Sequence, residues 1–210
     1  MNNKSKSRLK IEKIFNLMEL FVEMIKNSLT FWLYFIKGMG FLTIYPALET
    51  LSLVSLDIYN HQRIKTLKNF MEKYNNTMRK RFFSLFVFFY LFYSTLFILL
   101  PLTAKASAFF YILKFILIIS NISLYIFMVT RPILKKQFTF IKLKPTVQVF
   151  LLLKEIKWTI VMIIGVSLAF YLSYKNFIFL IFVFPGLSGW FISWCMEKII
   201  KAIMVKYNIQ

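Results

Sequence analysis

Long apolar runs rich in aromatic residues alternate with short basic segments along this chain of 210 residues. The run at 82–102 is uninterrupted by charge, and comparable runs cover 28–45, 108–130, 158–174 and 177–195. Each is close to or above the roughly 17 residues with which an α-helix crosses the hydrocarbon core of a bilayer. These five runs predict membrane-spanning helices.

A sixth apolar stretch, 47–59, is shorter and carries two acidic residues, Glu49 and Asp57. Pro46 stands directly before it and suits the first turn of a helix, where a missing N–H costs nothing. Basic segments precede and follow 28–59, so the chain between them crosses the membrane twice or not at all. The stretch is either a short span buried by the rest of the protein or a re-entrant return, and we favour the span.

Other segments repeat apolar residues every three or four positions between charges, which predicts amphipathic helices along the membrane surface. One covers 9–26, and another follows Pro145. A third covers 64–80, where the lysines and Arg79 are expected to point away from an apolar face. That face comprises Ile64, Leu67, Met71, Tyr74 and Met78.

Basic residues are concentrated between the predicted spans. Of the 27 Lys and Arg residues, 23 lie in 1–26, 61–81, 131–157 and 196–210. The positive-inside rule places all four segments, and therefore both termini, in the cytoplasm. The prediction is an all-α, polytopic membrane protein forming one domain over 1–210. It has about six apolar helices, the second short or re-entrant, and cytoplasmic amphipathic helices that bind anionic lipid.

Composition and motifs exclude several classes of protein. A chain with 59% hydrophobic residues and 26 Phe is too apolar for a soluble core of this size. The net charge of +19 flanks the spans and is not accompanied by a nucleic-acid-binding motif, so no nucleic-acid partner is expected. The single cysteine, Cys195, permits no intrachain disulfide. No phosphate loop, HExxH motif or nucleophile elbow is present, so we expect no enzyme activity, cofactor or metal.

Four positions are candidate sites, each with a structural alternative. Acidic groups such as Glu49 and Asp57 are costly at membrane depth unless they pair, bind an ion or line a cavity. The structural alternative is that Glu49 caps the helix after Pro46 and that Asp57 lies at the cytoplasmic interface. Pro185 and Gly186 are expected to interrupt the last span, either exposing carbonyls to a substrate or allowing close helix packing, which we favour.

Two stretches resemble the YesL-type family of bacterial membrane proteins. The first is Thr43-Ile44-Tyr45-Pro46-Ala47-Leu48, and the second is the basic aromatic helix from Phe70 through Tyr74 to Lys80. The resemblance covers essentially the whole chain. It implies a multi-pass protein of the bacterial plasma membrane in a setting of carbohydrate utilisation, with sugar ABC transporter components as partners.

Together these features predict a non-catalytic accessory or scaffold protein linked to carbohydrate uptake or glycan utilisation. The alternative is a small transporter or channel in its own right. A transporter needs polar residues that converge from several spans, and 82–102 and 108–130 offer few of them besides tyrosines.

Overall fold

The computed structural model describes residues 3–38, 43–60, 66–77, 81–100, 107–138 and 144–207. Within these ranges every regular element is an α-helix, which confirms the all-α prediction. The helices are α1 (Asn3–Lys37), α2 (Ile44–Tyr59), α3 (Thr66–Thr77), α4 (Arg81–Leu99), α5 (Ala108–Gln137), α6 (Pro145–Lys154), α7 (Ile156–Lys175), α8 (Phe177–Phe182) and α9 (Phe184–Tyr207).

Helix α2 lies at the centre of the fold and packs against α1, α3, α4, α5 and α9. Thirteen of its 16 residues are buried, among them Ala47, Leu51 and Val54 with no exposed surface. The expectation that this short segment is covered by the rest of the protein is therefore confirmed. Burial on all sides explains why its apolar residues are not confined to a single stripe, although five buried polar residues interrupt them.

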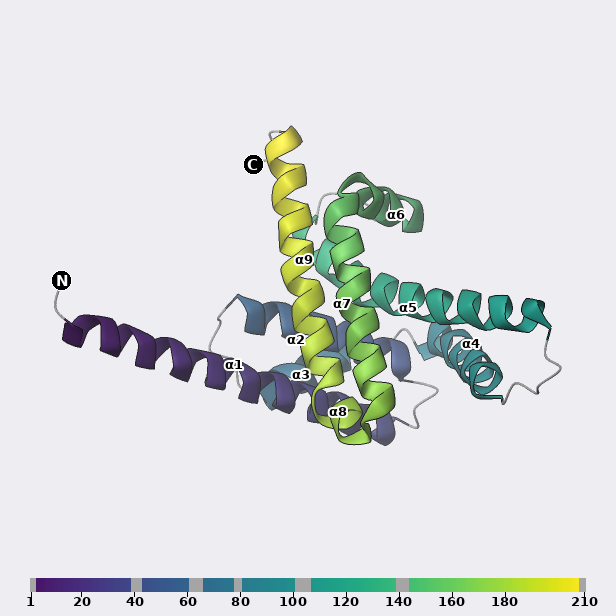
Figure 1. Cartoon of the computed structure of the whole chain (residues 1–210), viewed down its shortest axis with the longest axis horizontal. Helices are drawn as coiled ribbons and strands as arrows, with labels where there is room; N and C mark the ends of the chain where they lie inside the picture. The colour runs from purple at the N-terminus through teal and green to yellow at the C-terminus, as the bar shows by residue number, and fades with distance from the viewer. Residues whose placement is uncertain are drawn as a thin grey trace.

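The other helices extend from this centre in different directions. Figure 1 shows α1 reaching to one side and α5 to the other, whereas α7 and α9 run across that line. Helices α7 and α9 pack closely against each other, and α4 packs against α5. The C-terminal part of α5 and the inner face of α9 complete the core, through Val129, Ile133, Ile192, Met196 and Ile199.

Two helix boundaries differ from the sequence prediction. The predicted surface helix 9–26 and the first part of the apolar run 28–45 form one helix, α1, because no helix-breaking residue separates them. That helix ends at Lys37, and the last two residues of the run belong to α2. Helix α5 was expected to end at Arg131, but it continues through Pro132 to Gln137. Pro132 lacks an N–H, so the helical hydrogen bond to the carbonyl of Met128 is missing. Gln148 of α6 binds other groups in the same stretch of the helix. Its Nε2 donates to the carbonyl of Phe127 (2.7 Å) and to the hydroxyl of Thr130 (2.8 Å).

Helix α3 buries a face that matches the predicted one only in part. Of the predicted apolar positions, Leu67 and Met71 are 63% and 43% exposed, and Ile64 and Met78 lie outside the described residues. The buried residues are Thr66, Phe70, Tyr74 and Thr77. Tyr74 is therefore buried as predicted. The prediction was wrong for Leu67 and Met71, because α3 packs against polar and aromatic groups of α1 and α2.

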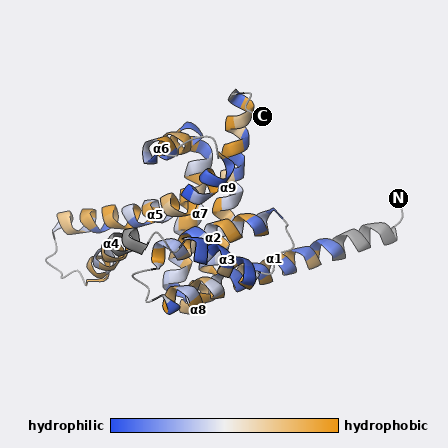
Figure 2. Ribbon diagram, turned by 180° about the vertical axis from the view of Figure 1, so that it is seen from behind, coloured by the Kyte–Doolittle hydropathy of each residue, from blue (hydrophilic) through white to orange (hydrophobic). Residues whose placement is uncertain are grey.

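Within the described residues, α5 and α7 are the two helices long and apolar enough to cross a membrane by length and composition. A shorter apolar segment, Val87–Leu99, lies in α4. Figure 2 shows hydrophobic residues along α4 and α5, in contrast to the polar α3. Soluble monomers rarely expose large apolar patches, and α4, α5 and α7 expose many large apolar side chains. These include Phe89, Phe92, Phe109, Phe115, Ile116, Ile160, Ile164 and Leu168.

Candidate functional site

The carboxylate of Asp57 is the centre of a charged cluster between three helices. Asp57, on α2, is 5% exposed and forms ion pairs with Lys73 of α3 and Lys136 of α5, the latter at 2.9 Å. Asn69 of α3 donates a further hydrogen bond to the same carboxylate at 3.1 Å. A buried carboxylate is tolerated when charged and polar donors surround it in this way.

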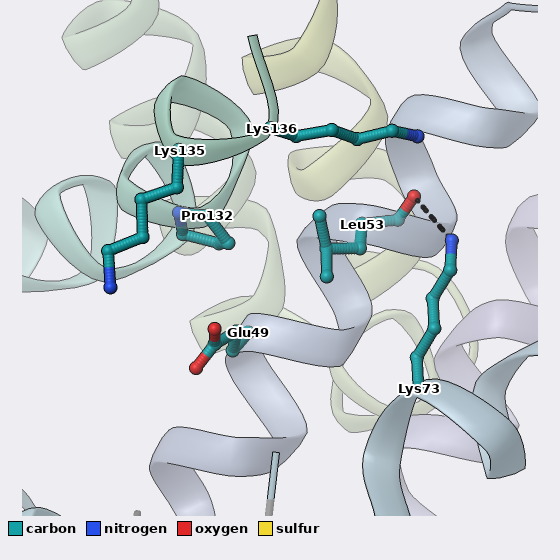
Figure 3. Close-up of a pocket in the computed structure, with 6 residues that line it drawn as sticks. All are labelled: Glu49, Leu53, Lys73, Pro132, Lys135 and Lys136. Atoms are coloured by element: carbon teal, nitrogen blue, oxygen red, sulfur yellow. Dashed lines mark hydrogen bonds between the residues drawn. The ribbon is translucent and has the colours of Figure 1, made fainter. Parts of the chain in front are cut away.

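An open pocket of about 300 Å³ adjoins this cluster and is lined by Glu49, Leu53, Lys73, Pro132, Lys135 and Lys136. In Figure 3, Lys73 and Lys136 approach each other on one side of Leu53, and Lys73 donates to the Leu53 carbonyl at 3.3 Å. Glu49 and Lys135 lie on the other side. Three ammonium groups and one carboxylate therefore line the pocket.

Glu49 does not cap the helix as the structural alternative supposed. Helix α2 begins at Ile44, two residues before Pro46, and its N-cap is Thr43. Pro46 is still within the first turn, where backbone N–H groups have no partner inside the helix. Glu49 is consequently the sixth residue of α2, beyond the reach of a cap. It is 6% exposed.

Helix α3 is held along the length of α2 by contacts at both of its ends. Asn69 and Lys73 reach Asp57 near the end of α2, whereas the hydroxyl of Thr77 lies 3.3 Å from that of Thr50 near its start. The two helices are therefore antiparallel. At the start of α3, the hydroxyl of Thr66 donates to Glu23 of α1.

The aromatic residues singled out by the sequence, Phe70 and Tyr74, join α3 to α1. The ring centroid of Tyr34 lies 5.4 Å from that of Phe70 and 4.7 Å from that of Tyr74. Phe70 has no exposed surface, and the hydroxyl of Tyr74 donates to the Tyr34 carbonyl at 3.4 Å. Such ring contacts add about 0.5–1.5 kcal/mol each to the burial of the rings. Both residues therefore serve helix packing.

Pro185 and Gly186 lie at the start of α9, after a break at Val183 that separates it from α8. The backbone N–H of Gly186 donates to the hydroxyl of Ser28 on α1 at 2.8 Å. A Cβ at Gly186 would lie 2.1 Å from the carbonyl oxygen of Met24. The glycine thus allows two helix backbones to approach closely, as the favoured alternative expected.

The same helix is also linked to the end of α2. Tyr59 of α2 stacks obliquely with Trp190 of α9, with ring centroids 6.0 Å apart. Further along α9, hydrogen bonds from Lys201 and Tyr59 hold the pKa of Glu197 below its usual value. The hydrogen bond between Tyr59 and Glu197 thus joins α2 to α9.

The sequence did not identify the partners of Asp57. The cost of a carboxylate at this depth signals that a cation must lie nearby, and both 61–81 and 131–157 are rich in lysine. Lys73 was expected to point away from the packed face of its helix, so it was assigned to the wrong side. In the part of the chain that the structure describes, no three His, Cys, Asp or Glu residues are grouped to hold a metal ion.

Comparisons of the chain with protein-family models, curated proteins and solved structures find no match. The resemblance to the YesL-type family therefore stays a prediction from the residues quoted above.

Proposed function

We propose that this chain is a multi-pass protein of the bacterial plasma membrane that acts as a non-catalytic scaffold. The main support is that the polar groups at the centre of the fold bind one another. Asp57, Lys73, Lys136 and Asn69 bind one another and join three helices. Groups engaged in this way hold the fold together and are not poised for proton transfer or nucleophilic attack.

The proposed topology has four crossings, made by α4, α5, α7 and the α8–α9 pair. The run at 28–45, which the sequence predicted as a span, does not cross in this topology. Helix α3 lies antiparallel along α2, and the chain on either side of α3 belongs to the basic segment 61–81. Both ends of α2 are therefore near residues that favour the cytoplasmic side. This supports the re-entrant alternative for 47–59 over the span favoured from the sequence.

Cysteine labelling tests this topology. In a chain with Cys195 replaced by Ser, single cysteines at Lys105 and Lys175 should react with an impermeant maleimide in intact cells. Cysteines at Lys68 and Lys142 should react only after the cells are opened. Lys37, exposed at the end of α1, distinguishes the two alternatives: a re-entrant α2 leaves a cysteine there unlabelled from outside, whereas a span exposes it. External labelling at Lys142 would refute the four-crossing arrangement.

The exposed face of α3 is the surface that we propose for a partner, with components of a sugar ABC transporter as the partner class that the family resemblance implies. Leu67 and Met71 remain exposed, beside the surface ion pair of Lys68 with Glu72. The same basic segment would attract an anionic leaflet, at about 1 kcal/mol per lysine. An apolar pair on a charged helix is a suitable contact for a protein.

Substitution on this face tests the scaffold role. Leu67→Ser with Met71→Ser should leave membrane abundance unchanged, because both side chains lie outside the core, and should reduce co-purification of transporter components at least fivefold. The matched control, Val205→Ser, removes an 80% exposed apolar side chain from α9 and should have no effect. Unchanged co-purification, or equal loss in the control, would argue against this surface.

A further inference from the structure

A second cavity, of about 160 Å³, lies between the α4–α5 pair and the α7–α9 pair, next to α2. Eleven residues from α2, α4, α5, α7 and α9 line it, and none of them carries a charge. Eight are hydrocarbon or thioether side chains, including Met128, Val166 and Phe170. An apolar cavity of about 150 Å³ excludes water and admits a molecule of the size of benzene.

The wall of this cavity reaches the apolar outer surface of the protein. Thr95 of α4 is exposed, and Phe170 of α7 is 45% exposed. A ligand could therefore enter sideways from the bilayer, between helices that the lipid surrounds. The uncharged lining excludes a phosphate-bearing headgroup, and three polar side chains are too few for a polyhydroxyl sugar.

Asn121 supplies the one amide group in this lining. Its Oδ1 accepts a hydrogen bond from the hydroxyl of Ser94 at 2.9 Å, and the same hydroxyl lies 3.1 Å from the carbonyl oxygen of Leu91. Its Nδ2 makes no hydrogen bond to any described residue. Asn121 is half-buried, so its amide donor remains available, and a ligand oxygen that accepts from it would gain affinity.

We propose that this cavity binds the uncharged end of a bilayer amphiphile, an alcohol or carbonyl group on a hydrocarbon chain, with Asn121 donating to its oxygen. The volume of the cavity, about 160 Å³, holds the end of one hydrocarbon chain and not a whole lipid. The proposal goes beyond the scaffold function and rests on the membrane placement for the source of its ligand.

Photolabelling of the full-length chain in a neutral detergent tests the site. The probes are a long-chain alcohol with a diazirine beside the hydroxyl-bearing carbon and the matching alkane without the hydroxyl, used at equal mole fraction in the micelle. The alcohol should label peptides of α4, α5 and α7 about fivefold more than the alkane does, consistent with one neutral hydrogen bond.

Two variants and a control make the result specific. Asn121→Leu should reduce labelling by the alcohol to the level of the alkane. Val166→Phe fills the cavity without touching the bond between Ser94 and Asn121, and should reduce labelling by both probes at least tenfold. Ser123→Leu, on the exposed side of α5, should change neither.

Equal labelling by alcohol and alkane, or labelling that persists in Val166→Phe, would overturn the site. Because labelling is performed in detergent, its failure is distinct from a failure of the topology, which maleimide labelling in cells measures separately.

Discussion

Replacing Gly186 with alanine should destabilise the protein by about 3 kcal/mol, the upper part of the range for overpacking a core. The added Cβ would lie 2.1 Å from the carbonyl oxygen of Met24 and 2.8 Å from its carbonyl carbon. Both atoms belong to the backbone of α1, so a side-chain rotation cannot relieve the contact. Separating α9 from α1 would also break the hydrogen bond from Gly186 to Ser28. Membrane abundance and resistance to limited proteolysis in detergent measure the effect.

Gly165→Ala is the matched control for this prediction. The three atoms nearest to its Cβ would belong to the ring of Phe191, the closest at 2.2 Å, and that ring can turn aside. The loss of stability should therefore be clearly smaller, and helix propensity favours alanine by roughly 1 kcal/mol. If Gly165→Ala and Gly186→Ala reduce stability equally, the backbones of α9 and α1 do not approach closely enough to exclude a Cβ at Gly186.

Apolar run length predicted most of the helices correctly. The runs at 108–130, 158–174 and 177–195 coincide with α5, α7 and the α8–α9 pair, because long apolar stretches form helices whether lipid or protein covers them. The turn at Asn176 was also predictable, since its side chain accepts hydrogen bonds from the N–H groups of Ile178 (2.9 Å) and Phe179 (3.3 Å). Such caps depend on neighbouring residues alone.

The orientation of α3 could not be predicted in the same way. Hydrophobic periodicity assumes that the packed face is the most apolar one, which fails where the neighbours are polar. Here α2 presents Asp57 and Thr50 to α3, so Lys73 and Thr77 are directed inward. When two helices each carry apolar and polar residues, the sequence alone does not determine which of their faces pack together.

Removing both lysines that neutralise Asp57 should prevent the protein from accumulating. In Lys73→Met with Lys136→Met, the carboxylate keeps only the hydrogen bond from Asn69, while its side chain is 7% exposed. An unpaired buried charge costs about 3–5 kcal/mol, which is a large part of the stability of a typical domain. Each single substitution should be milder, because one ammonium group remains. Membrane abundance of the variants, compared at equal transcript levels, measures the loss.

A third substitution separates the cost of the buried charge from the loss of the lysines themselves. Adding Asp57→Leu to the double variant removes the uncompensated carboxylate and should restore accumulation, because an apolar group of similar size can replace a buried ion pair without loss. Lys68→Met with Lys201→Met removes two exposed partners of Glu72 and Glu197 and should have little effect. If the triple variant is no more abundant than the double variant, the lysines hold α3 and α5 by their alkyl chains rather than by charge. The ion pairs of Asp57 would then no longer support the scaffold proposal.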